Sequence, residues 1–181
     1  MWGLIYVGAF LVSFAASAVL KVTWHPLGDK YSVRWDDSVG TVYTDLSYGE
    51  GDANKFDLYL PADSTKGTYG LVVYLHAGGF TSGDKSDDAG MLQWLCSKGY
   101  VAAGINYTLF SEEHPDANVY TQSVEIRDSI PYVLAAAEER SYSIDRMAVS
   151  GGSAGHTLAM LYAYRDAAAS PVPVKLVFGA V

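Results

Sequence analysis

Cysteine is nearly absent from this sequence, which contains only Cys96 among 181 residues. A single cysteine excludes an intrachain disulfide and any zinc site built from cysteines. Positive charge is also scarce, because 12 Lys and Arg stand against 20 Asp and Glu, for a net charge of −8. Nucleic acid and anionic membrane surfaces are therefore poor partners, since both bind clustered positive charge. No spacing matches an EF-hand or a histidine-based metal site, so we expect neither a metal nor a cofactor.

Charged side chains are missing from the first twenty residues, and residues 2–20 form an apolar run interrupted only by Ser and Gly. That length is at the lower limit of what spans a bilayer. The small residues at 16–18 favour a cleaved signal peptide, although the basic residues that precede such a run are missing. The length and the flanking Trp2 and Trp24 favour an uncleaved anchor. A buried core helix is a third alternative, but one of this length without a charge is unusual.

We therefore expect residues 1–20 to be a signal peptide or an N-terminal membrane anchor. The protein is then exported, and is either secreted or anchored to the membrane through residues 2–20 with its remaining domain outside the cytoplasm. Residues 21–40 are polar and contain Gly, which is typical of a connector. The domain itself is expected to cover residues 41–181.

Beyond residue 40, apolar strand patterns alternate with helical patterns. Strands are expected at residues 41–47, 55–60, 70–75, 100–106, 146–150 and 174–181, and helices at residues 88–98, 120–140 and 154–165. The first two strands are expected to pair antiparallel at a sheet edge. The later alternation predicts an α/β fold with a mostly parallel central sheet flanked by helices.

A serine lies in a glycine-rich turn between an expected strand and an expected helix. Residues 150–156 read SGGSAGH, which contains Gly-x-Ser-x-Gly with Ser153 at its centre. A sharp strand-to-helix turn strains the backbone at such a serine and exposes its hydroxyl, while Gly151 and Gly155 must be small because neighbouring chain passes close by. The motif alone also fits an ordinary loop. Its position between a strand and a helix favours a nucleophile.

A second glycine-rich segment, His76 to Phe80 (HAGGF), directly follows the strand at residues 70–75. Adjacent glycines leave backbone N–H groups unobstructed, which suits an oxyanion hole, although a flexible turn has the same composition. Two nucleotide-binding alternatives fail on spacing. Residues 78–86 lack the contiguous Gly-Lys-Ser of a phosphate-binding loop, and residues 49–51 lack the third glycine of a dinucleotide fingerprint.

Taken together, these motifs resemble the α/β-hydrolase superfamily, and more narrowly its hormone-sensitive-lipase-like and carboxylesterase branch. The resemblance covers residues 41–181 and is supported by residues 55–61 (KFDLYLP), 80–85 (FTSGDK), 99–109 (GYVAAGINYTL) and 144–146 (IDR). It implies that Ser153 is the nucleophile, attacking an ester carbonyl to form an acyl-enzyme. It also implies an oxyanion hole built from the N–H groups of Gly78, Gly79 and Ala154, with His76 orienting the loop.

The sequence departs from the family pattern in two ways. Ala77 occupies a position where the family usually has glycine, but the two following glycines supply the donors, so the hole is expected to stay intact. The family's acid and histidine follow the serine in chain order, and here only His156 and Asp166 do so. We interpret them as a helix-packing histidine and a solvated charge. His25 and His114 lie in the connector and a polar loop, and neither is a candidate for the base.

Six strands are expected where the resembling fold normally has eight, so we expect the acid and histidine to be missing together with the last two strands. The function expected of the parent protein is that of a serine carboxylesterase acting on a small-molecule ester, with this chain alone inactive or nearly so. The alternatives are a non-catalytic, membrane-tethered α/β-hydrolase-like binding domain and a serine peptidase on the same fold.

Overall fold

The computed structural model describes residues 2–23 and 31–180, which belong to two units that divide at Ser32. The first unit contains one helix, α1 (Trp2–Thr23), whose described side chains are exposed. By length and composition its stretch Gly3–Leu20 suffices to cross a membrane. The helix is therefore compatible with a signal peptide or an anchor, and a buried core helix is not what the structure has. Trp24 and His25 lie outside the described residues.

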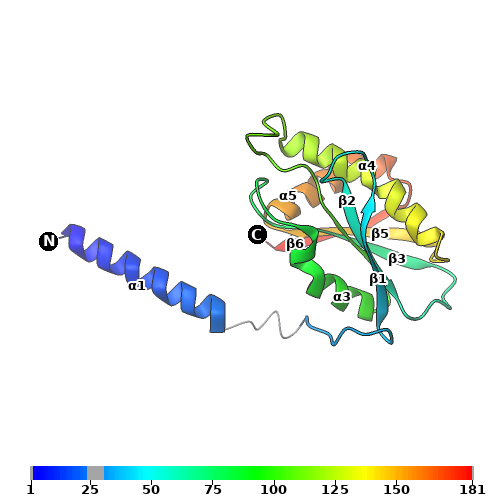
Figure 1. Ribbon diagram of the computed structural model, residues 1–181, viewed down its shortest axis with the longest axis horizontal. Helices are drawn as coiled ribbons and strands as arrows, with labels where there is room; N and C mark the ends of the chain where they lie inside the picture. The colour runs from blue at the N-terminus through cyan, green and yellow to red at the C-terminus, as the bar shows by residue number, and fades with distance from the viewer. Residues whose placement is uncertain (1, 24–30, 181) are drawn as a thin grey trace. The chain divides into compact units, whose positions relative to one another are not determined.

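The second unit is built on a six-stranded sheet with the order β1-β2-β4-β3-β5-β6 (Figure 1). β1 and β2 pair antiparallel at one edge, β2 is also antiparallel to β4, and the remaining neighbours are parallel. The strands are β1 (Gly40–Ser47), β2 (Lys55–Pro61), β3 (Tyr69–Leu75), β4 (Val101–Ile105), β5 (Ile144–Gly152) and β6 (Val174–Ala180). The mostly parallel sheet and the antiparallel edge pair are confirmed.

Helices cover both faces of the sheet because its central strands are apolar on both sides. On one face, Val72 and Ala102 pack with Leu95 of α3 (Ala89–Ser97). On the opposite face, Val73 and Ala103 pack against α4 (Val119–Glu138) and α5 (Ala154–Leu161). Alternate residues of one strand point to opposite faces, so each continuous apolar run serves two cores.

The helix ends differ from those expected. A 3-10 turn, η1 (Lys85–Asp88), precedes α3, and α4 begins after Asn118, whose side chain caps its first turn. The helix expected to reach residue 165 ends as α5 at Leu161 and continues as a wider π turn, η2 (Tyr162–Asp166), and a 3-10 turn, η3 (Ala167–Ala169). In η2, Asp166 is only 8% exposed. Its interpretation as a solvated charge was wrong, because the carboxylate is buried and paired with the adjacent Arg165.

Candidate active site

The two glycine-rich segments follow the carboxyl ends of two neighbouring parallel strands, so they lie at the same end of the sheet. β3 and β5 run parallel, and Leu75 at the end of β3 pairs with Gly151 near the end of β5. The loop that begins at His76 and the turn that carries Ser153 therefore start side by side. Sequence motifs 75 residues apart meet because parallel strands end at a common edge.

Ser153 occupies a strained backbone conformation between β5 and α5. Its φ is 48° and its ψ is −114°, a region that residues with a side chain rarely adopt. The residue is exposed, and its hydroxyl has no hydrogen-bond partner within the described chain. Such a conformation is stable only where the surroundings enforce it. Here the hydroxyl stands clear at the end of the sheet.

The turn around Ser153 packs directly against the end of β3, which leaves no room for larger residues. A Cβ atom on Gly151 would lie 2.6 Å from the carbonyl oxygen of Leu75. One on Gly155 would lie 2.7 Å from the carbonyl oxygen of His76. Both separations are shorter than real Cβ contacts, so the two glycines are required by close backbone approach, as the motif predicted.

The loop after β3 folds back on itself and presents two free amides. Gly78 and Gly79 have φ angles of 132° and 62°. The carbonyl oxygen of Gly78 accepts hydrogen bonds from the N–H groups of Thr81 and Ser82, at 3.2 and 3.0 Å. No acceptor among the described residues is bonded to the N–H of Gly78 or Gly79. These two amides are available to a bound anion, together with that of Ala154 at the start of α5.

His76 is buried beneath this loop and does not reach into it as a proton carrier. Its Nδ1 lies 2.8 Å from the carbonyl oxygen of Ala77, a contact that requires the proton on Nδ1. Its ring stacks on Tyr107, with ring centroids 4.4 Å apart and an interplanar angle of 7°. These contacts are what a residue that orients the loop would make.

The stretch that follows the loop is bound to β2 and to the end of β4 through buried polar contacts. The ammonium of Lys85 lies 2.8 Å from Asp45 and 3.1 Å from Asp57, which is itself buried. Burial lowers the pKa of Lys85, but its hydrogen bonds to the two carboxylates outweigh this and hold the pKa above its ordinary value. The segments 55–61 and 80–85 are therefore joined by an ion pair that charge patterns alone did not predict.

A second contact of this kind involves Asp84 and Asn106. The amide of Asn106 donates to Asp84 at 2.6 Å and accepts from the N–H of Lys85 at 2.7 Å. Burial raises the pKa of Asp84, but hydrogen bonds from Ser86 and Asn106 outweigh it and bring the pKa to about 2. The carboxylate is therefore charged at neutral pH and holds the loop against β4.

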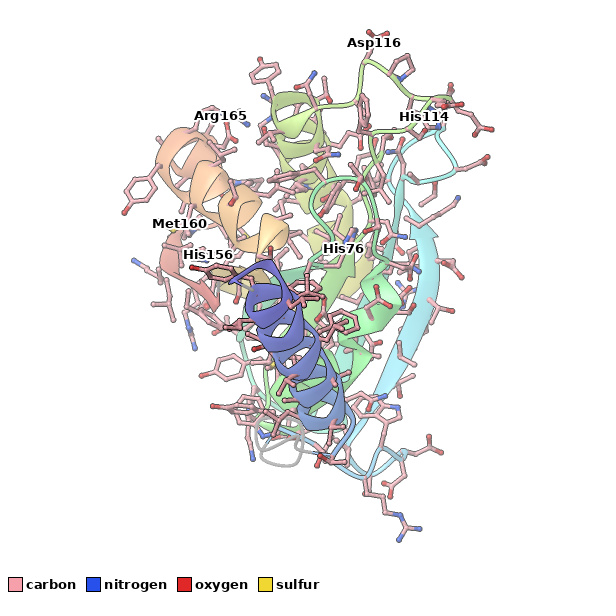
Figure 2. The ribbon with its side chains drawn as sticks, turned by 90° about the vertical axis from the view of Figure 1, so that its left-hand side faces the viewer. His76, His114, Asp116, His156, Met160 and Arg165 are labelled. Carbon is pink, nitrogen blue, oxygen red and sulfur yellow. The ribbon has the colours of Figure 1, made fainter. Side chains whose placement is uncertain are left out.

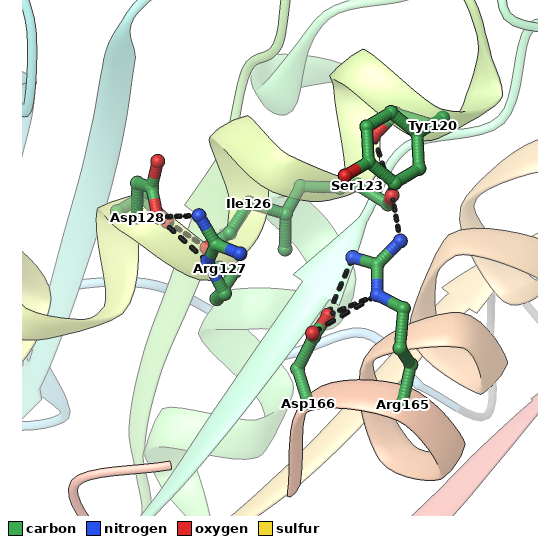
Figure 3. A network of polar contacts seen from close by, with 8 residues as sticks. Tyr120, Ser123, Ile126, Arg127, Asp128, Arg165 and Asp166 are labelled. Atoms are coloured by element: carbon green, nitrogen blue, oxygen red, sulfur yellow. Dashed lines mark hydrogen bonds and ion pairs between the residues drawn. The ribbon is translucent and has the colours of Figure 1, made fainter. Parts of the chain in front are cut away.

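In the described part of the chain, neither the three histidines His76, His114 and His156 nor an acid downstream of Ser153 is placed to complete a triad with that serine. The ring of His156 packs against Gly179 of β6, and its Nδ1 is buried without a partner. His114 is exposed in the loop before α4, away from His76 and His156 (Figure 2). Asp166 is ion-paired with Arg165 at 2.6 Å (Figure 3). His25 lies outside the described residues. Within those residues, no cluster of His, Cys, Asp or Glu could hold a metal ion.

A family profile described as BD-FAE matches residues 56–171. The chain is 30% identical over 123 residues to a Mycobacterium tuberculosis protein named "Probable carboxylic ester hydrolase LipM", covering 66% of this chain and 27% of that protein. It is also 30% identical over 122 residues to kynurenine formamidase of Salmo salar, covering 67% of this chain and 38% of that enzyme. The chain thus spans less than half the length of these curated relatives.

Solved structures show the same fold. Esterase B from Lactobacillus rhamnosis superposes with a TM-score of 0.71 at 23% identity, covering 95% of this chain and 56% of that one. At this identity the likeness concerns the fold alone. It extends over nearly the whole of the chain.

Proposed function

The chain belongs to the BD-FAE family of α/β-hydrolases, and we propose that it carries the nucleophile and the oxyanion hole of a serine carboxylic ester hydrolase. The proposal is supported above all by the backbone of Ser153. A strained, exposed serine at a strand-to-helix turn is typical of a nucleophile elbow. The turn that carries Ser153 also begins next to the loop whose two amides have no bonded acceptor among the described residues.

In the proposed reaction, the Ser153 Oγ attacks the carbonyl carbon of the ester while a general base takes the hydroxyl proton. The carbonyl oxygen becomes an oxyanion that accepts hydrogen bonds from the N–H groups of Gly78, Gly79 and Ala154. Ala154 is the first residue of α5, so the positive end of the helix dipole also faces the developing charge. Collapse of the intermediate expels the alcohol with a proton from the base, and water then releases the acid from Ser153.

The general base and its acid are proposed to come from outside residues 1–181. His156 is engaged in packing against β6, and Asp166 is neutralised by Arg165, so neither is free to activate the serine. Serine without a base is a poor nucleophile. We therefore expect the chain of residues 1–181 alone to hydrolyse esters far more slowly than the full-length protein.

The test compares the full-length protein with its Ser153→Ala variant on short-chain aryl esters. Loss of Ser153 is expected to lower kcat on the order of 10⁶-fold, as in a serine protease. Ser150→Ala is the matched control, because it removes a buried hydroxyl without a partner three residues away. The control is expected to keep kcat within about 3-fold. Equal hydrolysis by the wild type and Ser153→Ala would refute the nucleophile.

A formamide is a second substrate class, favoured by the resemblance to kynurenine formamidase. Hydrolysis of an aryl formamide by the same serine, and faster than that of the aryl ester, would favour this class. Cleavage of peptide substrates would favour a serine peptidase. A full-length protein that turns over none of these would favour the non-catalytic, membrane-tethered binding domain.

The helix α1 is proposed to direct export, as a cleaved signal or as an anchor for a domain outside the cytoplasm. Its length and its lack of charge from residue 2 to residue 20 support this. Cell fractionation and the mass of the mature protein distinguish the two forms. A soluble cytoplasmic protein of uncleaved mass would contradict both.

A further inference from the structure

The oxyanion-hole segment is held at its two ends by buried side chains that belong to other elements. The segment begins at His76 and ends at Phe80, and its free amides lie between. Tyr107, after β4, contacts the first residue, and Gln122, in the first turns of α4, contacts the last. Neither side chain has a part in the reaction proposed above.

Tyr107 determines the direction in which the loop leaves β3. The residue is 1% exposed, and its hydroxyl donates a hydrogen bond of 3.1 Å to the carbonyl oxygen of His76. Because its ring also stacks on the imidazole of His76, both the side chain and the backbone of that residue are held by one tyrosine. The peptide that enters the loop therefore has one orientation.

Gln122 holds the far end of the segment together with the N–H of Phe110, which donates to the carbonyl oxygen of Phe80 at 3.1 Å. Its side-chain amide is fully buried and donates to the carbonyl oxygens of Phe80, at 2.9 Å, and Thr108, at 3.0 Å. Its Oε1 is buried and has no partner among residues 2–23 and 31–180. A buried acceptor without a partner lowers stability, so the cost at Oε1 offsets part of what the two donated bonds contribute. Its two donors, which join the loops after β3 and β4, are what an apolar side chain cannot supply.

We propose that Tyr107 and Gln122 are positioning residues that aim the Gly78 and Gly79 amides at the oxyanion. This inference rests on the proposed function. The hole works only when its donors lie at hydrogen-bond distance from the place where the oxyanion forms. The loop between the two anchors has positive φ angles at Gly78, Gly79 and Phe80. Its own bonds go to the carbonyl oxygens of Ala77 and Gly78, and none in the described chain involves the two amides, so the anchored ends help to determine where those amides point.

The test measures ester hydrolysis by the full-length protein with Gln122→Met and with Tyr107→Phe, which keeps the stacked ring. Each variant is expected to lower kcat roughly 10- to 100-fold while KM changes less than about 3-fold, because the oxyanion exists only beyond the ground state. The Ki of a trifluoromethyl ketone, which forms an oxyanion adduct with the nucleophile, is expected to rise by the same factor. Loss of folded protein would lower kcat but leave that Ki unchanged.

Two control variants remove similar bonds elsewhere. Tyr142→Phe deletes a buried hydroxyl that donates to the carbonyl oxygen of Pro61 at 2.6 Å, at the opposite end of β3 and β4. Glu125→Gln weakens the bonds of α4 to Thr108 without touching the oxyanion segment. Both are expected to keep kcat and Ki within about 3-fold.

Two results would overturn the inference in distinguishable ways. Turnover that is abolished by Ser153→Ala but unaffected in both Gln122→Met and Tyr107→Phe would refute the positioning role alone, as would a fall in kcat with an unchanged Ki. Turnover that survives Ser153→Ala would refute the proposed function, and the positioning role with it. If Gln122→Met does not fold, Tyr107→Phe alone decides.

Discussion

The close approach of α5 to the end of β3 sets a size limit at Gly155 that one methyl group exceeds. A Cβ on Gly155 would overlap the carbonyl oxygen of Leu75 and lie 2.7 Å from that of His76. Real Cβ atoms essentially never come closer than 3.0 Å to another heavy atom. Both neighbours are backbone atoms, so no rotation of a side chain relieves the overlap. Gly155→Ala must therefore separate α5 from β3.

The expected loss of stability follows from two opposing terms. Overpacking that shifts backbone costs about 3 kcal/mol, the upper end of its usual range. Gly155 lies within α5, where alanine is favoured over glycine by about 1 kcal/mol. The net loss is then about 2 kcal/mol. Gly152→Ala is the matched control, because its Cβ would meet Ala77 at 3.7 Å and Tyr74 at 4.0 Å, which are ordinary contacts.

Urea unfolding of the full-length protein measures this difference, read as a shift in midpoint at constant slope. Gly152→Ala is expected to stay within about 0.5 kcal/mol of the wild type. Gly155→Ala is also expected to lower kcat roughly 100-fold, because Ser153 moves with α5 relative to the oxyanion loop. A Gly155→Ala protein as stable and as active as Gly152→Ala would refute the close approach and the packing argument built on it.

Two further predictions concern buried charge. Lys85→Met leaves Asp57 buried without its counter-charge and is expected to lower the free energy of unfolding in urea by about 3 kcal/mol. The double variant Lys85→Met, Asp57→Leu should recover most of this loss. A double variant as unstable as Lys85→Met would contradict the pairing. Burial, aided by the charge of Asp87, raises the pKa of Asp88 to about 6. Because the pKa of this carboxyl is higher in the folded protein than in the unfolded chain, the protein loses stability as the pH rises from about 4 to about 6. Asp88→Asn should therefore stabilise the protein by about 1 kcal/mol at pH 7.5, after solvent screening, and should have no such effect at pH 3.5. An equal effect at both pH values would contradict this shift.

Strand positions were predictable where burial requires a recognisable pattern of apolar residues. The runs at residues 70–75 and 101–105 are apolar without interruption because both faces of β3 and β4 are covered. The start of β5 was not predictable in this way. Ile144 joins the sheet by pairing with Tyr69, a backbone contact that is followed by the exposed Asp145 and Arg146. Hydrophobic periodicity carries no information about such a contact.

Buried charges were not predictable from the sequence, and the interpretation of Asp166 as solvated was wrong for this reason. Lys and Asp are residue types that are usually exposed. The sequence around Lys85 and Asp166 does not distinguish these two residues from the exposed charged residues of the other loops. Both are buried together with a group of opposite charge. Lys85 is paired with Asp57 of β2, and Asp166 is paired with the adjacent Arg165. A carboxylate or an ammonium is identified as buried only when its partner is known, and the partner is a property of the fold.

In the candidate site as well, a sequence motif identifies some residues and only the fold identifies the others. The turns at Ser153, Gly78 and Gly79 were predictable because the roles proposed for these residues depend on backbone conformation, which restricts the residue type at each position. Tyr107 and Gln122 act through carbonyl oxygens 31 and 42 residues away. Every residue has a carbonyl oxygen, so the acceptor imposes no residue type and leaves no motif. Mutations after β4 and in α4 are therefore expected to alter the oxyanion hole while both glycine-rich motifs stay unchanged.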